Sequence, residues 1–317
     1  MNMKTINSIF ICASALLFLA CSKVAAPSEA ADKALVEFSR PVQQEENTTP
    51  RYTVFYADLS ASAYIPSKVY IDEAYKTRWN AGDMISIFQT TANECFEFQG
   101  NDGDRAGAFE AIGQVDEGNA IDDIYAVYPY SQETGITSAG VLGLTLSSVQ
   151  NYEYKSYGRG ANTMVCKTSD EQLFFKSVGG FLVIKLYGTN VSVSSVSVSA
   201  NGEEALAGTA NVSFDNEDSP LVAITQGTPS VSVVCEPAVT LGSSATDYTE
   251  FWFVLPPVTL SEGFTVTVTG ANGKTYEKVS RKQRVIDRNT ITPMTPFEVV
   301  FSTNQIGDGE EQDGGDY

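Results

Sequence analysis

The residue best placed to take part in chemistry is Cys21. It follows Leu17-Phe18-Leu19-Ala20, so that a small residue directly precedes a cysteine, the pattern that bacterial lipoprotein processing recognises. Lys4 and the twelve-residue apolar run from Ile9 to Ala20 complete an export signal that is too short to span a bilayer. The sequence therefore predicts removal of residues 1–20 and lipidation of Cys21 with acyl chains such as palmitate, which anchor a chain without spanning the membrane. An ordinary secretory signal is the alternative.

Other reactive groups are scarce in this sequence of 317 residues. It has no histidine, which removes Ser-His-Asp and Cys-His nucleophiles, imidazole-bound zinc and the commonest general base. Asp and Glu number 39, yet no spacing singles out a catalytic pair. The net charge of −19 disfavours nucleic acid, because cations supply most of the affinity for phosphate backbones. The sequence predicts neither an enzyme nor a cofactor site.

Three groups of side chains have a functional and a structural interpretation. Asn101, Asp102 and Asp104 lack the spacing of a calcium loop and fit a hairpin tip better. The cysteines that remain beyond Cys21 are odd in number and too scattered for a metal site, so buried thiols are expected; they are Cys95, Cys166 and Cys235. Either of two groups of tyrosines could form an aromatic glycan-binding platform, although packing is favoured; the groups are Tyr125, Tyr128 and Tyr130, or Tyr152, Tyr154 and Tyr157.

The elements that must position these residues are strands. Thr265-Val266-Thr267-Val268-Thr269 alternates with period two. Residues 181–187 place Leu182, Ile184 and Leu186 on one face and Lys185 on the other, as expected for a strand packed on one face only. The alternation in residues 191–200 shifts at Ser194-Ser195, which predicts a bulge. Sustained helical periodicity is missing, so the expected class is all-β. Hairpin turns are predicted at Asn101-Asp102-Gly103, Gly179-Gly180, Asn201-Gly202 and Asn272-Gly273.

The predicted organisation has five parts. They are a signal peptide (1–20), an N-terminal linker (21–51), two β-sandwiches (52–168 and 169–303) and an acidic tail (304–317). A polar stretch from Lys167 to Gln172 marks the joint between the sandwiches. The continuously apolar run Phe251-Trp252-Phe253-Val254-Leu255 predicts a strand buried on both faces, and Trp79 is expected in a core.

Several segments together resemble the fimbrillin, or Mfa-like, lipoproteins of Bacteroidales type V pili. They are Arg78 to Phe88, Gln150-Asn151-Tyr152, Phe175 to Leu182, Phe251 to Pro257 with Gly263 to Val268, and Arg288 to Val299. The resemblance covers most of residues 50–301. It implies two transthyretin-like (Ig-like Greek-key) β-sandwich domains in series, export to the outer membrane as a lipoprotein, and a place in a surface fimbrium without catalysis.

The resemblance also implies an assembly mechanism. In stalk subunits of the family an Arg-specific protease removes the lipidated N-terminal strand, and a strand from the next subunit fills the groove. Here the removable strand would be Ala34-Leu35-Val36-Glu37-Phe38-Ser39, and the cut would follow Arg51 or Arg40. Arg51 is favoured, because Pro41 follows Arg40. An uncut lipid tether is the alternative.

The role within a fimbrium stays open between stalk, tip or accessory subunit and anchor. A donor strand needs alternating apolar residues, but residues 304–317 contain five acidic residues and only Ile306 as an aliphatic side chain. The expected partners are other fimbrial subunits, through strand addition, and the outer membrane, through the lipid on Cys21; a host or bacterial surface ligand is a further option. A surface glycan-binding lipoprotein of a carbohydrate-uptake system is the alternative function.

Overall fold

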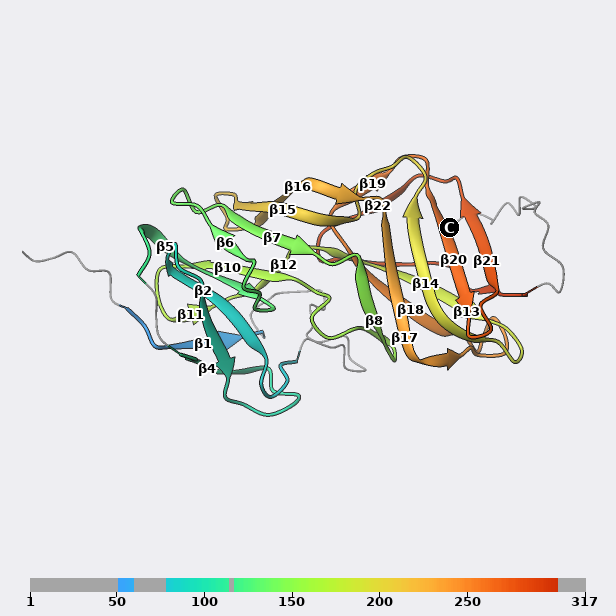
Figure 1. Ribbon diagram of the computed structural model, residues 1–317, viewed down its shortest axis with the longest axis horizontal. Helices are drawn as coiled ribbons and strands as arrows, with labels where there is room; N and C mark the ends of the chain where they lie inside the picture. Colours follow the sequence, from blue (N-terminus) through green and yellow to red (C-terminus); the bar gives the residue numbers. More distant parts are fainter. Residues whose placement is uncertain (1–50, 60–77, 114–116, 302–317) are drawn as a thin grey trace, which may run out of the picture. The chain divides into compact units, whose positions relative to one another are not determined.

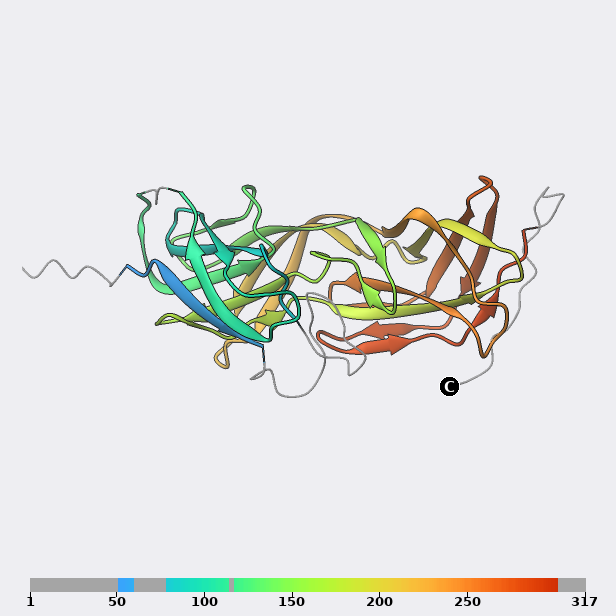
Figure 2. The same ribbon diagram turned by 90° about the horizontal axis from the view of Figure 1, so that it is seen from below.

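The computed structural model describes residues 51–59, 78–113 and 117–301. Within these ranges the chain forms twenty-four strands and no helix, so the prediction of an all-β protein is confirmed. Figures 1 and 2 show the strands from two directions. The candidate residues Cys21 and Arg40 and the segment Ala34–Ser39 lie outside the described residues.

The largest sheet has eight strands and contains most of the first half of the chain. In spatial order they are β11 (Gln172–Leu173), β1 (Val54–Asp58), β4 (Ala106–Ala111), β3 (Glu94–Phe98), β2 (Met84–Thr90), β5 (Ala120–Tyr128), β10 (Met164–Thr168) and β12 (Lys176–Ser177). One face packs around Trp79, which is fully buried and makes edge-on contacts with Phe109 and Phe175. The prediction that Trp79 belongs to a core is confirmed.

The opposite face of this sheet packs against a four-stranded sheet. Its strands are β16 (Pro220–Thr228), β15 (Ala207–Phe214), β7 (Leu142–Leu146) and β6 (Gly135–Ile136). Phe88 and Val127 of the first sheet belong to one apolar cluster with Leu142 and Val212 of the second. Burial on both faces explains why β5 ends in a continuously apolar run, Ile124–Tyr128, and why four successive residues of β2, Ile85–Phe88, are all buried.

The second half of the chain builds a six-stranded sheet. Its strands are β21 (Thr275–Ser280), β20 (Phe264–Gly270), β14 (Ser192–Ala200), β17 (Ser230–Thr240), β8 (Val149–Glu153) and β9 (Ser156–Tyr157). The valines of β20 are buried and its threonines half-buried, as the alternation predicts. The register of β14 shifts between Val193 and Ser195 against both neighbours, which confirms the bulge.

A four-stranded sheet packs its inner face against the six-stranded sheet. It contains β18 (Thr249–Leu255), β13 (Gly180–Tyr187), β23 (Ile291–Pro293) and β24 (Phe297–Glu298), and a separate pair joins β19 (Val258–Leu260) to β22 (Arg284–Ile286). Phe251, Phe253 and Leu255 face one apolar cluster, whereas Trp252 and Val254 face another. The prediction that this run is buried on both faces is confirmed.

Two of the four predicted hairpin turns are confirmed. Asn101-Asp102-Gly103 connects β3 to β4, and Asn272-Gly273 connects β20 to β21, with Gly273 at a φ of +78°. The other two do not close hairpins, because β14 does not pair with β15 and β12 does not pair with β13, although Asn201-Gly202 does form a turn. The expectation that residues 181–187 pack on one face only is also wrong. Phe181 and Val183 are as deeply buried as their neighbours, because β13 lies between two apolar clusters.

Strand pairing crosses the predicted joint at residues 167–172. Both β11 and β12 belong to the first sheet, although they follow the joint, while β8 pairs with β17 of the second half. Residues Thr49–Tyr317 form one compact unit of contacts. The division into two sandwiches at residue 168 therefore stays a prediction.

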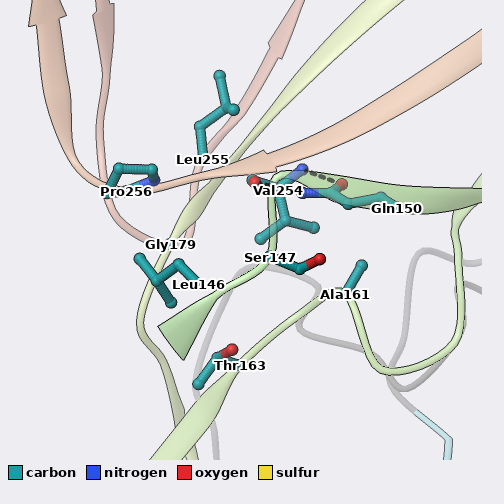
Figure 3. A pocket seen from close by; sticks show the side chains of 9 residues that line it. All are labelled: Leu146, Ser147, Gln150, Ala161, Thr163, Gly179, Val254, Leu255 and Pro256. Atoms are coloured by element: carbon teal, nitrogen blue, oxygen red, sulfur yellow. Dashed lines mark hydrogen bonds between the residues drawn. The ribbon is translucent and has the colours of Figure 1, made fainter. Parts of the chain in front are cut away.

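A side chain completes the hydrogen bonding of the buried strand β18 (Figure 3). The amide of Gln150 donates from Nε2 to the carbonyl of Val254 at 2.8 Å and accepts from the Val254 N–H at 3.0 Å. Gln150 thus makes the two bonds that a neighbouring strand would make. The residues lining the adjacent hollow include Gly179, Leu146 and Thr163, and the space has room for about one water molecule.

Two glycines allow the start of β13 to approach its neighbours. A side chain at Gly179 would lie 2.5 Å from the Leu255 carbonyl, and one at Gly180 would collide with the Asp287 carbonyl. The Asn289 N–H donates to the Gly179 carbonyl at 2.7 Å. Three of the segments that carry the family resemblance therefore meet here, around the ends of β13 and β18. Their shared role is backbone packing.

We predict that Gln150→Ala lowers the free energy of unfolding by about 1–3 kcal/mol, because two buried backbone groups of Val254 lose their partner. A water molecule entering the adjacent hollow keeps the loss toward the lower figure. The measurement is the urea midpoint, with the exposed neighbour Asn151→Ala as control. Equal losses in the two variants would show that the amide bonds contribute nothing specific.

Candidate functional site at Arg51

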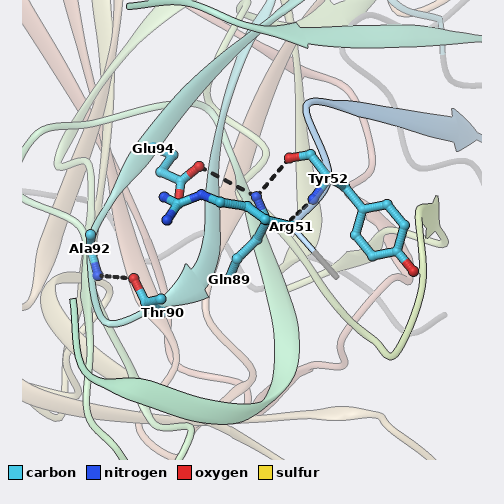
Figure 4. Close-up of polar contacts among 6 residues, drawn as sticks. All are labelled: Arg51, Tyr52, Gln89, Thr90, Ala92 and Glu94. Carbon is cyan, nitrogen blue, oxygen red and sulfur yellow. Dashed lines mark hydrogen bonds and ion pairs between the residues drawn. The ribbon is translucent and has the colours of Figure 1, made fainter. Parts of the chain in front are cut away.

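Arg51 lies three residues before β1, the strand drawn in blue in Figure 1. Its Nη2 contacts Glu94 Oε1 at 2.7 Å (Figure 4). The Arg51 side chain is 39% exposed, whereas that of Glu94, at the start of β3, is only 3% exposed. A guanidinium paired with a buried carboxylate is held more firmly than one on an open linker. The Arg51 side chain is therefore partly exposed to solvent, while its guanidinium group is held by Glu94.

The residue after Arg51 is held as well. The Tyr52 N–H donates to Gln89 Oε1 at 2.6 Å, and Gln89 Nε2 donates back to the Tyr52 carbonyl at 2.8 Å. The same Nε2 lies 3.4 Å from Glu94 Oε2, so that Gln89 and Glu94 form one polar cluster around the Arg51–Tyr52 peptide bond. A protease binds its substrate as an extended, accessible strand. These contacts must therefore open before the bond can be cut.

The strand that follows has one closed edge and one largely open edge. Strand β1 pairs with β4 over five residue pairs, from Val54↔Glu110 to Asp58↔Ala106. On its other side it pairs with β11 over two, Tyr56↔Gln172 and Ala57↔Leu173. Its side chains alternate, with Phe55 and Ala57 buried and Tyr56 exposed. Removing the residues before Tyr52 would leave this strand in place.

The segment Arg78–Phe88 forms a braced turn instead of a reactive site. The Asp83 side chain is almost fully buried; its Oδ2 accepts the Asn80 N–H at 2.7 Å, and its Oδ1 accepts Arg159 Nη2 at 2.7 Å. Gly82 adopts a φ of +72°, which favours glycine. Burial raises the pKa of the Asp83 carboxyl, and the bonds from Asn80 and Arg159 oppose that rise.

Sequence reasoning did not find the partners of these two sites. Glu94 is 43 residues from Arg51, and Arg159 is 76 residues from Asp83. Neither residue lies in a motif, and an isolated Glu or Arg in a strand-rich sequence has many structural explanations. Only the pairing of strands brings them to their partners.

The remaining candidates have structural roles. Asp102 accepts the Ala81 N–H at 2.9 Å and Asp104 accepts the Asn101 N–H at 2.8 Å, as in a hairpin tip. Of the six tyrosines, Tyr125, Tyr128 and Tyr157 are buried, and Tyr154 is 69% exposed. Among the described residues, no three His, Cys, Asp or Glu side chains gather as metal ligands would.

The three described cysteines are free thiols. Burial raises the pKa of Cys166 to about 12 and that of Cys235 to about 11, which keeps both in the unreactive thiol form. Cys95 is half-buried, and its pKa is raised by burial and by Glu97. None of the described segments forms a helix of the length and hydrophobicity that a bilayer span requires.

Comparison with known proteins finds similarity only among solved structures. No protein-family model matches the chain, and no curated protein matches it significantly. A proposed cell adhesion protein from Bacteroides ovatus is 14% identical, with 77% of this chain and 91% of that chain covered and a TM-score of 0.46. A second, from Bacteroides uniformis, is 15% identical, with 78% and 92% covered and a TM-score of 0.43.

The tip fimbrial protein Mfa3 from Porphyromonas gingivalis, with a C-terminal truncation, is 10% identical over 71% of this chain and 80% of that chain, with a TM-score of 0.28. Of these three structures, one is named as a fimbrial tip protein and two as proposed cell adhesion proteins. At these identities and scores, the functions in those names belong to those proteins.

We predict that Arg159→Ala destabilises the protein by about 1–3 kcal/mol at neutral pH, because it leaves a buried carboxylate with one fewer partner. Asp83 should then have a still higher pKa in the folded state than in the unfolded state. In the variant, the Asp83 carboxyl binds a proton more readily in the folded protein than in the unfolded one. The destabilisation by Arg159→Ala is therefore complete above the raised pKa of Asp83. It decreases as pH falls through that pKa towards the ordinary value of 3.8.

Unfolding in urea at several pH values tests this expectation. Arg159→Lys, which keeps the charge but not the forked donors, should lose less. A loss in Arg159→Ala that does not change with pH would mean that Asp83 is not the group responsible.

Proposed function

We propose that the chain is a structural or adhesive subunit of a surface fimbrium, exported as a lipoprotein on Cys21. Other fimbrial subunits are its partners, through strand addition. Proteolysis after Arg51 removes the lipid together with the strand Ala34–Ser39. The proposal starts from the export signal with its Ala20-Cys21 junction and from the segments that resemble fimbrillins.

One observation carries the processing step. Arg51 stands between the linker and β1; Glu94 of the folded body pairs with Arg51, and Gln89 bonds the backbone of the next residue, Tyr52. A cut after Arg51 separates everything before Tyr52 and leaves every described strand intact. Processing at this bond is therefore compatible with a stable product.

Open strand edges support assembly by strand addition. Within the described residues, β16 and β21 are the terminal strands of their sheets, and each pairs along one side only. Leu221 of β16 and Val279 of β21 are about half exposed. An open edge offers backbone donors and acceptors to an incoming strand, and exposed alternate side chains add apolar contact.

The alternative roles differ in what they require. An anchor subunit keeps its lipid and needs no cut at Arg51. A glycan-binding lipoprotein needs a platform of exposed aromatic side chains, and of the six candidate tyrosines three are buried, two are half-buried and only Tyr154 is well exposed. No contact in the described residues favours the glycan-binding role over the fimbrial one.

The processing step predicts that Arg51→Lys blocks maturation. Lysine keeps the charge that pairs with Glu94, so the fold is preserved, but an Arg-specific protease does not accept it. N-terminal sequencing of protein from fimbriae should give Tyr52 for the wild type and no such end for Arg51→Lys. Arg40→Lys is the matched control and should mature normally. A mature wild-type end at Cys21 would exclude processing and favour the anchor.

The contacts of Arg51 predict that the cut is restrained by the fold. Glu94→Gln keeps the size of the side chain and removes the ionic partner, so cleavage by an Arg-specific trypsin-like protease should become about 3- to 10-fold faster, the equivalent of ~1 kcal/mol of easier opening. Glu97→Gln, on the same strand, should have no effect. Equal rates in Glu94→Gln and the wild type would mean that the peptide bond is already accessible.

Assembly is tested apart from processing. Unheated denaturing gels of surface material should show a ladder of sizes if the subunit polymerises, and immunogold labelling should place it along filaments, at their ends or at their bases. Labelling away from any filament, together with binding to a polysaccharide panel, would contradict the fimbrial proposal and favour the glycan-binding one.

A further inference from the structure

Positive charge is concentrated in one short part of this acidic chain. Residues 274–288 contain six of its 20 Lys and Arg residues and only two acidic residues, Glu277 and Asp287, whereas the whole chain carries a net charge of −19. We call five of these cations the basic strip; they are Lys274 just before β21, Lys278 on β21, Arg281 and Lys282 after it, and Arg284 at the start of β22.

The basic strip follows an open sheet edge. Strand β21 pairs with β20 along one side, and no other described strand pairs with it (Figures 1 and 2). Lys274, Arg281 and Lys282 are exposed. Lysines on an edge strand also serve to discourage pairing with other chains. Further observations distinguish a binding surface from this simpler role.

Two cations of the strip lack charge compensation from the described residues. Lys278 Nζ lies 4.8 Å from the centre of the Phe297 ring, and burial alone lowers its pKa, without a carboxylate to oppose the shift. Arg284 Nε is buried and has no hydrogen-bond partner among the described residues. Half-buried cations without anions nearby create a positive potential that an acidic segment would satisfy.

The position of the last described residues indicates which acidic segment could bind the basic strip. Phe297 stacks on Tyr276 of β21 with ring centres 6.3 Å apart, and the ring of Phe301 packs against Gly270, at the turn between β20 and β21. The chain continues from there with residues 302–317, which include five acidic residues and no Lys or Arg; the acidic residues are Asp308, Glu310, Glu311, Asp313 and Asp316.

Length and proximity favour the chain's own tail over other acidic partners. Sixteen extended residues reach about 50 Å, whereas the strip from Lys274 to Lys282 is about 25 Å long. A tethered segment that starts at the surface has an effective concentration of roughly millimolar, which a separate molecule rarely matches.

We propose that the acidic tail, residues 304–317, binds the basic strip of the same chain and covers the β21 edge. Attraction between the tail carboxylates and the strip holds the tail there, so binding weakens as salt screens the charges. A strand from another subunit can pair with β21 only after the tail is displaced. This inference does not depend on processing at Arg51 and survives if that step is wrong.

The test compares the exported chain without its signal, residues 22–317, with the same chain ending at Thr303. The probe is a fluorescein-labelled synthetic peptide of residues 304–317, followed by fluorescence anisotropy. The peptide should bind the shortened chain at least tenfold more tightly than the full chain, whose own tail competes. Raising NaCl from 50 to 300 mM should weaken binding at least fivefold.

Charge variants and a neutral peptide supply the controls. In the shortened chain, Lys274→Glu with Lys282→Glu should weaken peptide binding at least tenfold. Lys155→Glu, on the β8–β9 connection at the opposite edge of the same sheet, should leave it unchanged. A peptide with Asn and Gln in place of Asp and Glu should not bind. Because all three substituted residues are exposed, the variants should keep the urea midpoint of the shortened chain.

Three outcomes would overturn the proposal. Equal affinity of the peptide for the full and the shortened chain would mean that the tail does not occupy the strip. Concentration-dependent self-association of the full chain that is lost on shortening would assign the tail to a second copy. No measurable binding at low salt would leave the strip with only its role of discouraging edge pairing.

Discussion

The second half of the protein is organised by the burial of a strand pair on both faces. Strands β13 and β18 lie between two apolar clusters, so that neither side chains nor backbone groups on them can rely on solvent. Leaving a buried backbone group unpaired lowers the free energy of unfolding by a sizeable fraction of the protein's net stability. The buried backbone groups are satisfied in two ways. Hydrogen bonds come from Gln150 and Asn289, and Gly179-Gly180 leaves the space for the strands to approach closely. In this structure, the segments that carry the sequence resemblance thus have a packing role.

In the first half of the chain, the residues that stabilise the fold differ from the candidate processing site. Trp79 and the aromatic side chains around it form a core that needs no partner, and the Asp83–Arg159 pair braces its turn. Arg51, in contrast, is attached to the rim of this body by a few polar contacts. Polar contacts of this kind contribute little to the free energy of unfolding, and they can break without unfolding the core. A processing site at such a position can be restrained and still be used.

Charged residues are distributed unevenly in this protein. The chain is acidic as a whole, which favours repulsion between copies, while six of its 20 cations lie in residues 274–288, around the outer strand β21. An open edge strand is a hazard for a folded protein, because it can pair with the edge of another chain. Covering such an edge with an acidic segment of the same chain is reversible and sensitive to salt, unlike covering it with an apolar strand.

Local sequence patterns are sufficient to predict the all-β class, the bulge near Ser194, the doubly buried run Phe251–Leu255, the core position of Trp79 and the turns at Gly103 and Gly273, because each follows from local periodicity or from a glycine's backbone freedom. It also indicated Arg51 as a candidate, from residue type and neighbours. Three features become visible in the folded chain alone: Gly179-Gly180 and Asn201-Gly202 do not close hairpins, Glu94 and Gln89 hold Arg51 and Tyr52, and Gln150 completes the hydrogen bonding of β18. These depend on which strands pair across 37 to 104 residues of sequence, and such pairing is set by the simultaneous burial of several sheets, which no single segment encodes.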